Sequence, residues 1–373
     1  MLLTVEQELT RTAVREFAEA EIAPIAGEID RNHRFPVESL PKLAAQGLMG
    51  MPFPEECGGA GTDHVSYTIA IEELARVCAA TAVIVEAHVS LSTWPIWRYG
   101  TDEQRKKYLP DLASGRSVGA FGLTEPGAGT DAAAIATSAV PDGDGYVLNG
   151  SKVFITSGGY ADVVVVFART PEGGPSAFIV EKGTPGFTVG DGEDKLGIRG
   201  SNTPPLFFHD VHVPHEALLG KEGDGLRIAL STLDGGRVGI AAQAVGIAQG
   251  ALEASIRYAK ERVQFGKPLA AFQAIQWMVA DMATDVEAAR LLTYQAAALQ
   301  DAGKPFAIAA AKAKLFAAQA ATRVANQAIQ IHGGNGYTAA YPVERAFRDA
   351  KITEIYEGTN EVQRMVISRS LLR

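Results

Sequence analysis

The sequence predicts a mainly helical protein with a central β-domain, and two patterns carry this prediction. Apolar residues recur three and four positions apart in the first third of the chain and again after residue 225, as in amphipathic helices. Between these regions, short apolar runs alternate with Gly, Pro and Asp, as in strands joined by turns. A chain of 373 residues exceeds one ordinary core. We therefore expect three domains, over residues 1–117, 118–224 and 225–373.

The first domain is predicted to be helical. Thr4 and Gln7 have the spacing of a capping box, in which each side chain accepts a backbone N–H of the other residue. A helix is expected over residues 6–28, where Phe17 and Ile22 are spaced for one face. Further helices are expected over residues 40–46, 65–92 and 102–114, with a loop over 51–61.

The middle domain contains seven short apolar runs that we interpret as strands. They cover residues 118–123, 146–148, 153–156, 163–168, 177–180, 187–189 and 206–213. Asn149 and Gly150 separate two of these runs, and the pair favours a hairpin turn because both residues tolerate positive φ. We expect a small, mainly antiparallel sheet.

Three long helices are expected in the last domain. Apolar residues step by three and four over residues 238–256 and 275–299. An alanine-rich helix over residues 305–332 stops at Gly333 and Gly334, which suit a helix C-terminus. Such helices pack as a bundle, and their small residues also permit close approach between subunits.

Composition excludes several classes of function. The formal charge of −9 comes without a basic cluster, which argues against a nucleic-acid partner. Cys57 and Cys78 are too few for a disulfide framework or a four-thiolate metal site, and they fit a reducing cytoplasm. Charge appears at Glu6, too early for a signal peptide, and no run of about 20 apolar residues could span a bilayer. We expect a cytoplasmic enzyme without membrane insertion.

One carboxylate near the end of the chain is a candidate catalytic group. Glu357 lies between Tyr356 and Gly358 in an apolar stretch. Burial disfavours the charged form of a carboxylate and raises its pKa toward neutrality, which is what a general base needs. The alternative is a hydrogen-bonded carboxylate with an architectural role.

A glycine-rich loop over residues 121–131 follows the first predicted strand. Glycine lets backbone N–H groups turn toward an anion and threonine adds a hydroxyl donor, so the loop suits a pyrophosphate or a flavin edge, or is simply a turn. Gly127, Gly129 and Ala132 imitate a dinucleotide fingerprint. We reject that interpretation because no parallel βαβ unit follows.

Three histidines have the spacing of a metal site, but we interpret them as surface residues. His209, His212 and His215 are three positions apart, and residues so spaced on a strand point to opposite faces. Pro214 also breaks the segment. His332 ends a predicted helix, where it lies beside a cofactor or satisfies the helix terminus.

Two pairs of residues, one at each end, frame the long helix that begins the last domain. Asp234 and Arg237 are expected to open it, either as a local ion pair or as ligand contacts. Arg262 and Phe265 follow its end, where a cation and an aromatic ring suit a phosphate or an adenine, or lie in solvent.

Six segments occur in the order that is typical of one family. They are residues 124–131 (TEPGAGTD), 152–156 (KVFIT), 194–201 (DKLGIRGS), 262–266 (RVQFG), 330–334 (QIHGG) and 355–359 (IYEGT). Nearly the whole chain therefore resembles the acyl-CoA dehydrogenase family. The resemblance implies a helical N-terminal domain, a central β-domain and a C-terminal four-helix bundle.

The resemblance also implies FAD, held between the β-domain and the bundle and partly by a neighbouring subunit, with Thr156 near flavin N5. The implied cofactor-binding residues are Phe121, Leu123, Thr124, Gly129, Thr130, Phe154, Ile155, Thr156, Arg262, Phe265, Gln273, Gln330, Ile331, Gly333, Gly334, Thr359 and Glu361. The implied substrate-binding residues are Thr130, Asp234, Arg237 and Gly358. No metal is implied.

The implied reaction is the FAD-dependent α,β-dehydrogenation of an acyl-CoA to the trans-2-enoyl-CoA. Glu357 removes the α-proton, hydride passes to flavin N5, and the Glu357 N–H with a ribityl hydroxyl holds the thioester oxygen. Asp234 is followed by two glycines and no further carboxylate, so Glu357 is the sole strong candidate for the base. This pattern is similar to the short-chain, butyryl-CoA dehydrogenase-like branch; medium-chain or branched acyl groups, oxygen-using oxidases of this fold and a non-catalytic acyl-CoA-binding subunit are the alternatives.

The resemblance further implies a homotetramer and an electron-transferring flavoprotein as electron acceptor. Two positions depart from the family pattern. Phe154 stands where tryptophan is frequent, so stacking is kept but an indole donor is lost, and His332 stands where some short-chain members have leucine.

Overall fold

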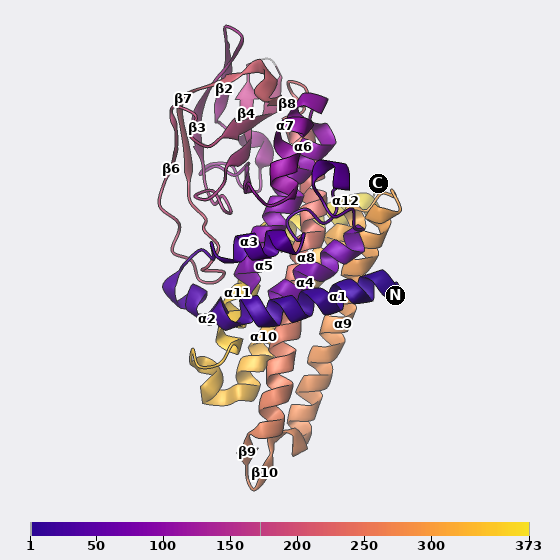
Figure 1. Cartoon of the computed structure of the whole chain (residues 1–373). Coiled ribbons are helices and arrows are strands. Elements are labelled where there is room, and N and C mark those ends of the chain that lie inside the picture. The colour runs from indigo at the N-terminus through magenta and orange to yellow at the C-terminus, as the bar shows by residue number, and fades with distance from the viewer. Residues whose placement is uncertain (1, 172, 373) are drawn as a thin grey trace.

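The computed structural model describes residues 2–171 and 173–372 and has three parts (Figure 1). A group of helices from the first third of the chain lies beside the middle of a long helical bundle, and a β-sheet covers one end of both. No helix in these residues combines the length and apolar content needed to cross a membrane.

The N-terminal part is helical, as predicted. Its α-helices are α1 (Val5–Phe17), α2 (Ala23–Asn32), α3 (Ser39–Ala45), α4 (His64–Val77), α5 (Ala79–Glu86), α6 (Trp94–Tyr99) and α7 (Asp102–Ala113). The capping box is confirmed, because Gln7 N donates to Thr4 Oγ1 at 3.2 Å and Thr4 N donates to Gln7 Oε1 at 3.0 Å. The helix expected over residues 65–92 is interrupted at Cys78, which is extended (φ −152°), and widens into a π-turn at Ala87–Thr93.

The sheet is mainly antiparallel, as expected. Its strands are β1 (Gly119–Gly122), β2 (Ser138–Asp142), β3 (Gly145–Lys152), β4 (Val163–Thr170), β5 (Gly174–Glu181), β6 (Phe187–Val189), β7 (Leu206–Pro214) and β8 (Leu218–Leu219). The order is β6-β7-β3-β2-β4-β5-β8, with β1 beside β4. Strands β1 and β2 run parallel to β4, because each reaches it through a crossover.

Two predictions about the sheet are wrong. Asn149 and Gly150 do not form a hairpin turn but lie inside β3, where the pairing with β7 shifts at a bulge. Gly150 is needed there because a Cβ would lie 2.6 Å from Thr137 Oγ1 on the neighbouring chain segment. The hairpin turn lies instead at Gly143 (φ 60°), after β2, a strand with too few apolar residues to be recognised. Residues 153–156 form a loop rather than a strand, since Phe154 adopts a left-handed conformation (φ 60°).

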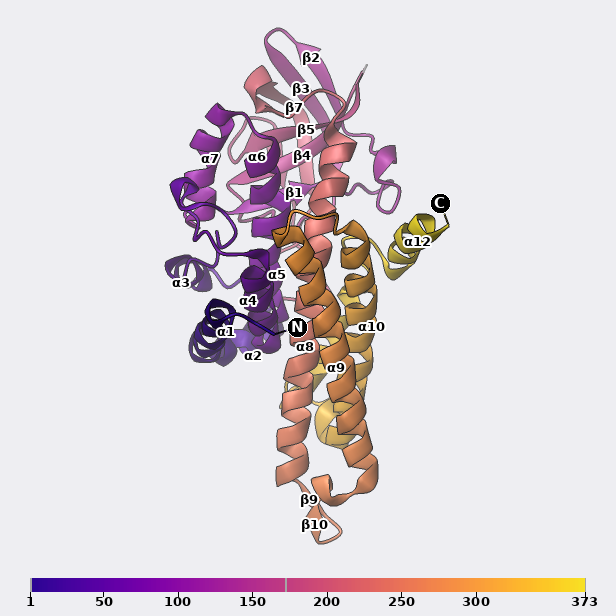
Figure 2. The same cartoon turned by 90° about the vertical axis from the view of Figure 1, so that its right-hand side faces the viewer.

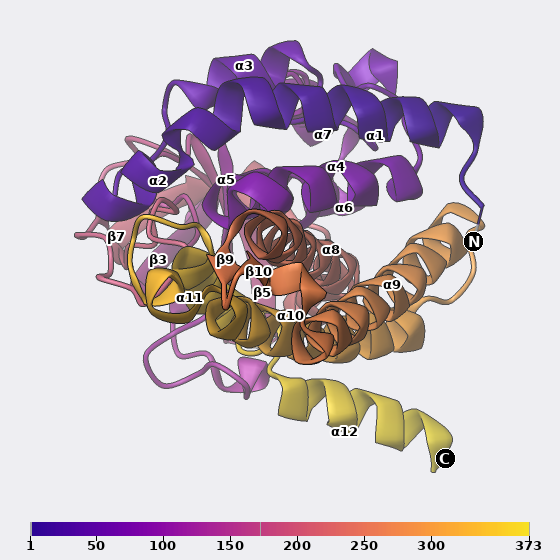
Figure 3. The ribbon, with the colours of Figure 1, turned by 90° about the horizontal axis from the view of Figure 1, so that it is seen from below.

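The last part is built on three long helices (Figure 2). Its α-helices are α8 (Gly225–Glu261), α9 (Gln273–Asp301), α10 (Ala307–His332), α11 (Val343–Ile352) and α12 (Asn360–Leu371). Seen along the bundle, α8 lies between α4 on one side and α9 and α10 on the other (Figure 3). Asp234 and Arg237 were expected to open α8, and this prediction is wrong. They lie in the interior of the helix, which already begins at Gly225.

A buried histidine joins the helical and β parts near the candidate site. The Gly119 N–H donates to His88 Nδ1 at 3.0 Å, so the proton on the ring is at Nε2, which donates to the carbonyl of Leu112 at 2.9 Å. Complete burial lowers the pKa of His88 to about 4 and keeps the ring neutral. The π-turn that carries His88 is thereby fixed against β1 and α7.

Candidate active site

Glu357 lies in the loop between α11 and α12. Glu357 and Gly358 both adopt left-handed conformations, with φ of 53° and 92°. A non-glycine residue rarely adopts positive φ, so the surroundings must hold Glu357 in place. Thr359 ends the loop as the N-cap of α12, where its Oγ1 accepts the Val362 N–H at 3.3 Å.

The Glu357 carboxylate packs against the backbone of α8. A Cβ on Gly236 would lie 2.0 Å from Glu357 Oε2, so glycine at this position makes room for the carboxylate. Leu91 closes the same space, with its Cδ2 2.9 Å from that Cβ position. Oε2 is buried, and no group among the described residues donates a hydrogen bond to it. This oxygen is therefore dry and receives no hydrogen bond from these residues.

Burial raises the pKa of Glu357 to about 7, while the neighbouring Glu86, Lys314 and Arg237 act in the opposite direction. The direction agrees with the expectation from the sequence. The residue as a whole is only half-buried, but its Oε2 is fully enclosed. A pKa near neutrality gives a carboxylate that is ionised in part at pH 7 and still basic.

Lys314 and Gln363 hold the loop from two helices, and sequence reasoning missed both. Lys314 Nζ and Gln363 Nε2 each donate to the carbonyl of Gly358 at 2.8 Å. Lys314 is fully buried, and this burial lowers its pKa to about 8. A signal did exist, because position 314 falls on the buried stripe of α10 with Ala310 and Ala317.

Glu86 is a second buried carboxylate beside Glu357, and it was also missed. It ends α5, and its Oε1 accepts a hydrogen bond from Ser90 Oγ on the π-turn. Complete burial, and then the charge of Glu357, raise the pKa of Glu86 well above its ordinary value. A single Glu within the apolar run of residues 79–92 was the available signal.

Asp234 and Arg237 form an ion pair of 2.6 Å one helical turn apart. Burial raises the pKa of Asp234, although Arg237 opposes this shift. Arg237 is itself buried, and its Nε has no partner in the part of the chain that the structure describes. The ion pair therefore leaves one edge of the guanidinium available beside Glu357.

The glycine-rich loop is anchored by one buried ion pair. Glu125 accepts from Lys152 Nζ at 2.6 Å and from the Thr137 N–H at 3.0 Å. The rest of the loop is open, since within residues 2–171 and 173–372 no heavy atom beyond the glycine and its two chain neighbours lies within 4 Å of a Cβ placed on Gly127 or Gly129. Gly129 and Thr130 are exposed, whereas the Leu123 side chain belongs to the core.

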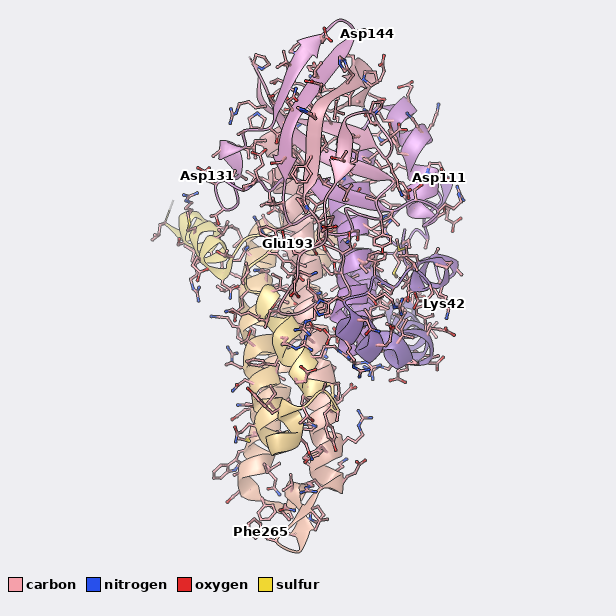
Figure 4. The ribbon with its side chains drawn as sticks, turned by 90° about the vertical axis from the view of Figure 1, so that its left-hand side faces the viewer. Lys42, Asp111, Asp131, Asp144, Glu193 and Phe265 are labelled. Carbon is pink, nitrogen blue, oxygen red and sulfur yellow. The ribbon has the colours of Figure 1, made fainter. Side chains whose placement is uncertain are left out.

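The segment with Phe154 lies directly beside this loop. The Val153 N–H donates to the carbonyl of Thr124 at 2.9 Å. Phe154 is 62% exposed despite its size, Thr156 is half-buried and Ile155 is in the sheet core. An exposed aromatic ring next to an open, glycine-rich loop suits a flat, anionic ligand. Helix α12, with Thr359 at its cap, lies on the same side of the molecule as the loop that carries Asp131 (Figures 2 and 4).

Phe121 lies on β1 and Glu361 on α12, whereas the seven other predicted cofactor residues lie at the opposite end of the molecule. Phe265, at the tip of the α8–α9 hairpin, is far from Asp131 (Figure 4), and it is 92% exposed. Arg262 and Gln273 flank the same tip and are exposed. Gln330, Gly333 and Gly334 are exposed at the end of α10, while the side chain of Ile331 is buried. One chain thus does not bring the two groups together.

His332 and the histidines of β7 take no part in the site. His332 is buried, stacks on Tyr258 at 4.3 Å and hydrogen-bonds the carbonyl of Ala328, so it completes the end of α10. His209 and His212 were expected to point to opposite faces of the strand, but both are exposed. The left-handed conformation of Asp210 shifts the alternation of buried and exposed residues along β7. No cluster of three metal-binding side chains occurs within residues 2–171 and 173–372.

Three domain descriptions of one family match the chain. They are the acyl-CoA dehydrogenase N-terminal, middle and C-terminal domains, over residues 4–116, 120–211 and 223–372. A short-chain specific acyl-CoA dehydrogenase of Clostridium acetobutylicum is 56% identical over 100% of this chain and 99% of its own length.

Two solved structures extend the comparison. Butyryl-CoA dehydrogenase from Megasphaera elsdenii has a TM-score of 0.98 and 50% identity, with all of both chains covered. A glutaryl-CoA dehydrogenase from Mycobacterium smegmatis in complex with FADH2 has a TM-score of 0.95 and 34% identity, covering 99% of this chain and 95% of that one. The chain therefore belongs to the acyl-CoA dehydrogenase family, in its short-chain branch.

Proposed function

We propose that this oxidoreductase converts a short-chain acyl-CoA to the trans-2-enoyl-CoA, with Glu357 as the base that removes the α-proton. The observation that carries the proposal is the Glu357 carboxylate, whose buried Oε2 lacks a partner among the described residues and whose pKa is raised to about 7. The α-C–H group of an acyl-CoA is a weak acid until the thioester carbonyl is polarised, and a carboxylate with this pKa is basic enough to remove its proton at that point.

The loop that carries Glu357 also supplies a donor for the thioester oxygen. In the described chain, the Glu357 N–H donates to no other group, and its left-handed turn keeps it free. Lys314 and Gln363 fix the next carbonyl, so this N–H is held in place before substrate binds. A preorganised donor stabilises the charge that develops on the thioester oxygen as the α-proton leaves.

The residues present fit FAD. Phe154 offers an exposed ring for the flavin, and the open loop at Gly127 and Gly129 has the backbone freedom to bind phosphate oxygens. Thr130 and Thr156 add hydroxyl groups at the same place. When bound, FAD supplies the acceptor for the β-hydrogen, which leaves as hydride.

A second subunit would complete the FAD site. Phe265, Arg262 and Gln273 form an exposed group with an unburied ring, and Phe265 lies too far from the loop that carries Asp131 for both to serve the same FAD within one chain (Figure 4). We therefore infer that this tip covers the adenine end of FAD in a neighbouring subunit, as in a homotetramer. Electron-transferring flavoprotein is the proposed electron acceptor.

Close packing around the base supports a short acyl group. Leu91 and Glu86 approach the same face of α8 as Glu357, which favours a short acyl group over a long one. Butyryl-CoA is the proposed substrate class. Arg237 and Asp234, with Thr130 and Gly358, are proposed to contact the acyl-CoA.

Purification and anaerobic titration test this function. The protein should be yellow, and butyryl-CoA should bleach the flavin absorbance in a stoichiometric titration. Parallel titrations with hexanoyl-, octanoyl- and isovaleryl-CoA show which acyl lengths and which branching the enzyme accepts. A colourless protein that does not take up added FAD would contradict the proposal, as would a flavin that no acyl-CoA reduces.

A further inference from the structure

We propose that Glu86 is a positioning residue that shares one proton with Glu357 and leaves Glu357 as the ionised member of the pair. The inference rests on the proposed function for its catalytic meaning, but the proton pair itself follows from geometry. Glu86 and Glu357 come from distant parts of the chain, the end of α5 and the loop before α12.

The two carboxyl groups pack on one face of α8. A Cβ on Gly236 would lie 2.0 Å from Glu357 Oε2, and a Cβ on Gly239 would lie 2.5 Å from Glu86 Oε1. Positions three apart on a helix share one face. The two glycines therefore form a shallow surface, without side chains, on which the carboxyl groups meet.

Both groups are left with an unsatisfied oxygen. Glu86 Oε2 and Glu357 Oε2 are buried, and neither has a hydrogen-bond partner of ordinary geometry within the described chain. Two adjacent carboxylates in a dry site do not both ionise near neutrality, because their repulsion is not screened. A single proton between them relieves the repulsion and provides the missing donor.

The charges around the pair also call for one proton. Facing it are Lys314 from α10, with Asp234 and Arg237 from α8. Two cations against three carboxylates leave one negative charge, which one proton neutralises. Tyr67 from α4 and Tyr356 from the loop complete the surroundings, and the pKa of each phenol is raised by burial, so both stay neutral.

The surroundings place the proton on Glu86. Glu86 is enclosed completely and its pKa is raised well above its ordinary value, whereas that of Glu357 is raised to about 7. Protonated Glu86 then donates to the Glu357 carboxylate and holds it toward the substrate side. In the reaction, the α-C–H bond breaks, its proton forms an O–H bond on Glu357, and its electron pair forms the double bond. The β-C–H bond breaks with its electron pair, and the β-hydrogen leaves as hydride, for which bound FAD would supply the acceptor. Glu86 keeps its own proton throughout.

The pH dependence of flavin reduction by butyryl-CoA, measured anaerobically on the holoenzyme by stopped flow, tests this role. Glu86→Gln keeps a donor of the same shape and should keep the midpoint of the acid limb close to that of the wild type. Glu86→Leu removes the donor and should raise the midpoint by about one pH unit, a roughly tenfold slower rate below it. An unchanged midpoint in Glu86→Leu, or an equal rise in both variants, would overturn the proposal.

Infrared spectroscopy tests the proton without relying on turnover. At pH 8, the oxidised holoenzyme should show the C=O stretching band of a protonated, buried carboxyl group. Asp349, buried with a pKa raised to about 6, is ionised at this pH. The band should disappear in Glu86→Gln and persist in the control Glu354→Gln. Its absence from the wild type, or its persistence in Glu86→Gln, would refute the shared proton even if the proposed function itself had failed.

Discussion

Glu125 and Glu357 are carboxylates with buried oxygens in two parts of the molecule, and they differ in what surrounds them. Glu125 forms an ion pair with Lys152 and accepts backbone N–H groups from the segment just before β2, so its pKa is lowered even though burial alone would raise it. Glu357 has a buried oxygen without a partner among the described residues, and its pKa is raised to about 7. Burial alone does not give a carboxylate the raised pKa of a base. The pKa rises when the carboxylate is buried without enough hydrogen-bond donors or an ion pair to stabilise its charge.

The difference also separates two roles. Glu125 fixes the loop that carries Gly129 and Thr130. It is not basic, because the ion pair with Lys152 and the backbone N–H groups stabilise its negative charge. Glu357 is held by its backbone, through Lys314 and Gln363 on the Gly358 carbonyl, and its carboxylate is left available. Four changes test this contrast.

The largest expected effect is that of Glu357→Gln on flavin reduction. Loss of the base should slow the reduction by butyryl-CoA by about 10³- to 10⁴-fold while FAD content stays unchanged. Glu354→Gln is the matched control, because Glu354 lies three residues earlier and pairs with Lys351 and Thr322. Stopped-flow absorbance measures both variants, and similar rates in the two would remove Glu357 from its role.

The buried ion pair should show its effect in stability rather than in chemistry. Lys152→Met leaves Glu125 charged and buried, which should lower the free energy of unfolding by about 3 to 5 kcal/mol. Urea unfolding of the apoprotein followed by circular dichroism measures the loss. A change below about 1 kcal/mol would mean that Glu125 is not held by this pair.

The two carboxylates should respond to pH with opposite signs. The folded pKa of Glu357, about 7, exceeds its ordinary value of 4.5, so its stabilising contribution is complete below 4.5 and is lost as pH rises through 7. The wild type should thus lose up to about 3 kcal/mol relative to Glu357→Gln between pH 4.5 and 8. For Glu125, whose pKa is lowered, stability is instead lost as pH falls. A wild-type advantage that grows with pH would reverse the assignment for Glu357.

The smallest effect is expected from the glycines of α8. Gly236→Ala places a Cβ 2.0 Å from Glu357 Oε2, which should displace the carboxylate and slow flavin reduction by about tenfold. At Gly235 the nearest atom to a new Cβ is Gln300 Nε2 at 4.0 Å, so Gly235→Ala should keep the rate and stabilise α8 by about 0.5 to 1 kcal/mol. Equal rates in the two variants would mean that Gly236 does not define the position of the base.

Local patterns predicted most of the fold. The long helices and the antiparallel strands follow from periodicity, and the capping box at Thr4 follows from residue chemistry. The hairpin expected at Asn149 and Gly150 failed because Gly150 serves a close approach to Thr137, a contact between segments that no local pattern contains.

The candidate site was predictable only in part. Glu357 was found because a carboxylate in an apolar stretch is conspicuous, and because its segment resembles a family motif. Glu86 and Lys314 were missed because their roles arise from neighbours far away in sequence, Glu357 and the Gly358 carbonyl. The resemblance assigns the two groups of FAD residues to neighbouring subunits, and in one chain Asp131 and Phe265, which mark the two groups, lie at opposite ends. Their joint role at one FAD stays a prediction.

The central claim is that Glu357, whose Oε2 is buried without an ion pair or a backbone donor among the described residues, is the base. The pH profile of wild-type flavin reduction tests this claim most directly. In anaerobic single-turnover reactions with butyryl-CoA, the rate should rise with pH with a midpoint of about 7, as Glu357 ionises. The same dependence should be absent from the residual rate of Glu357→Gln. A midpoint near 4.5, or an unchanged profile in Glu357→Gln, would contradict the account.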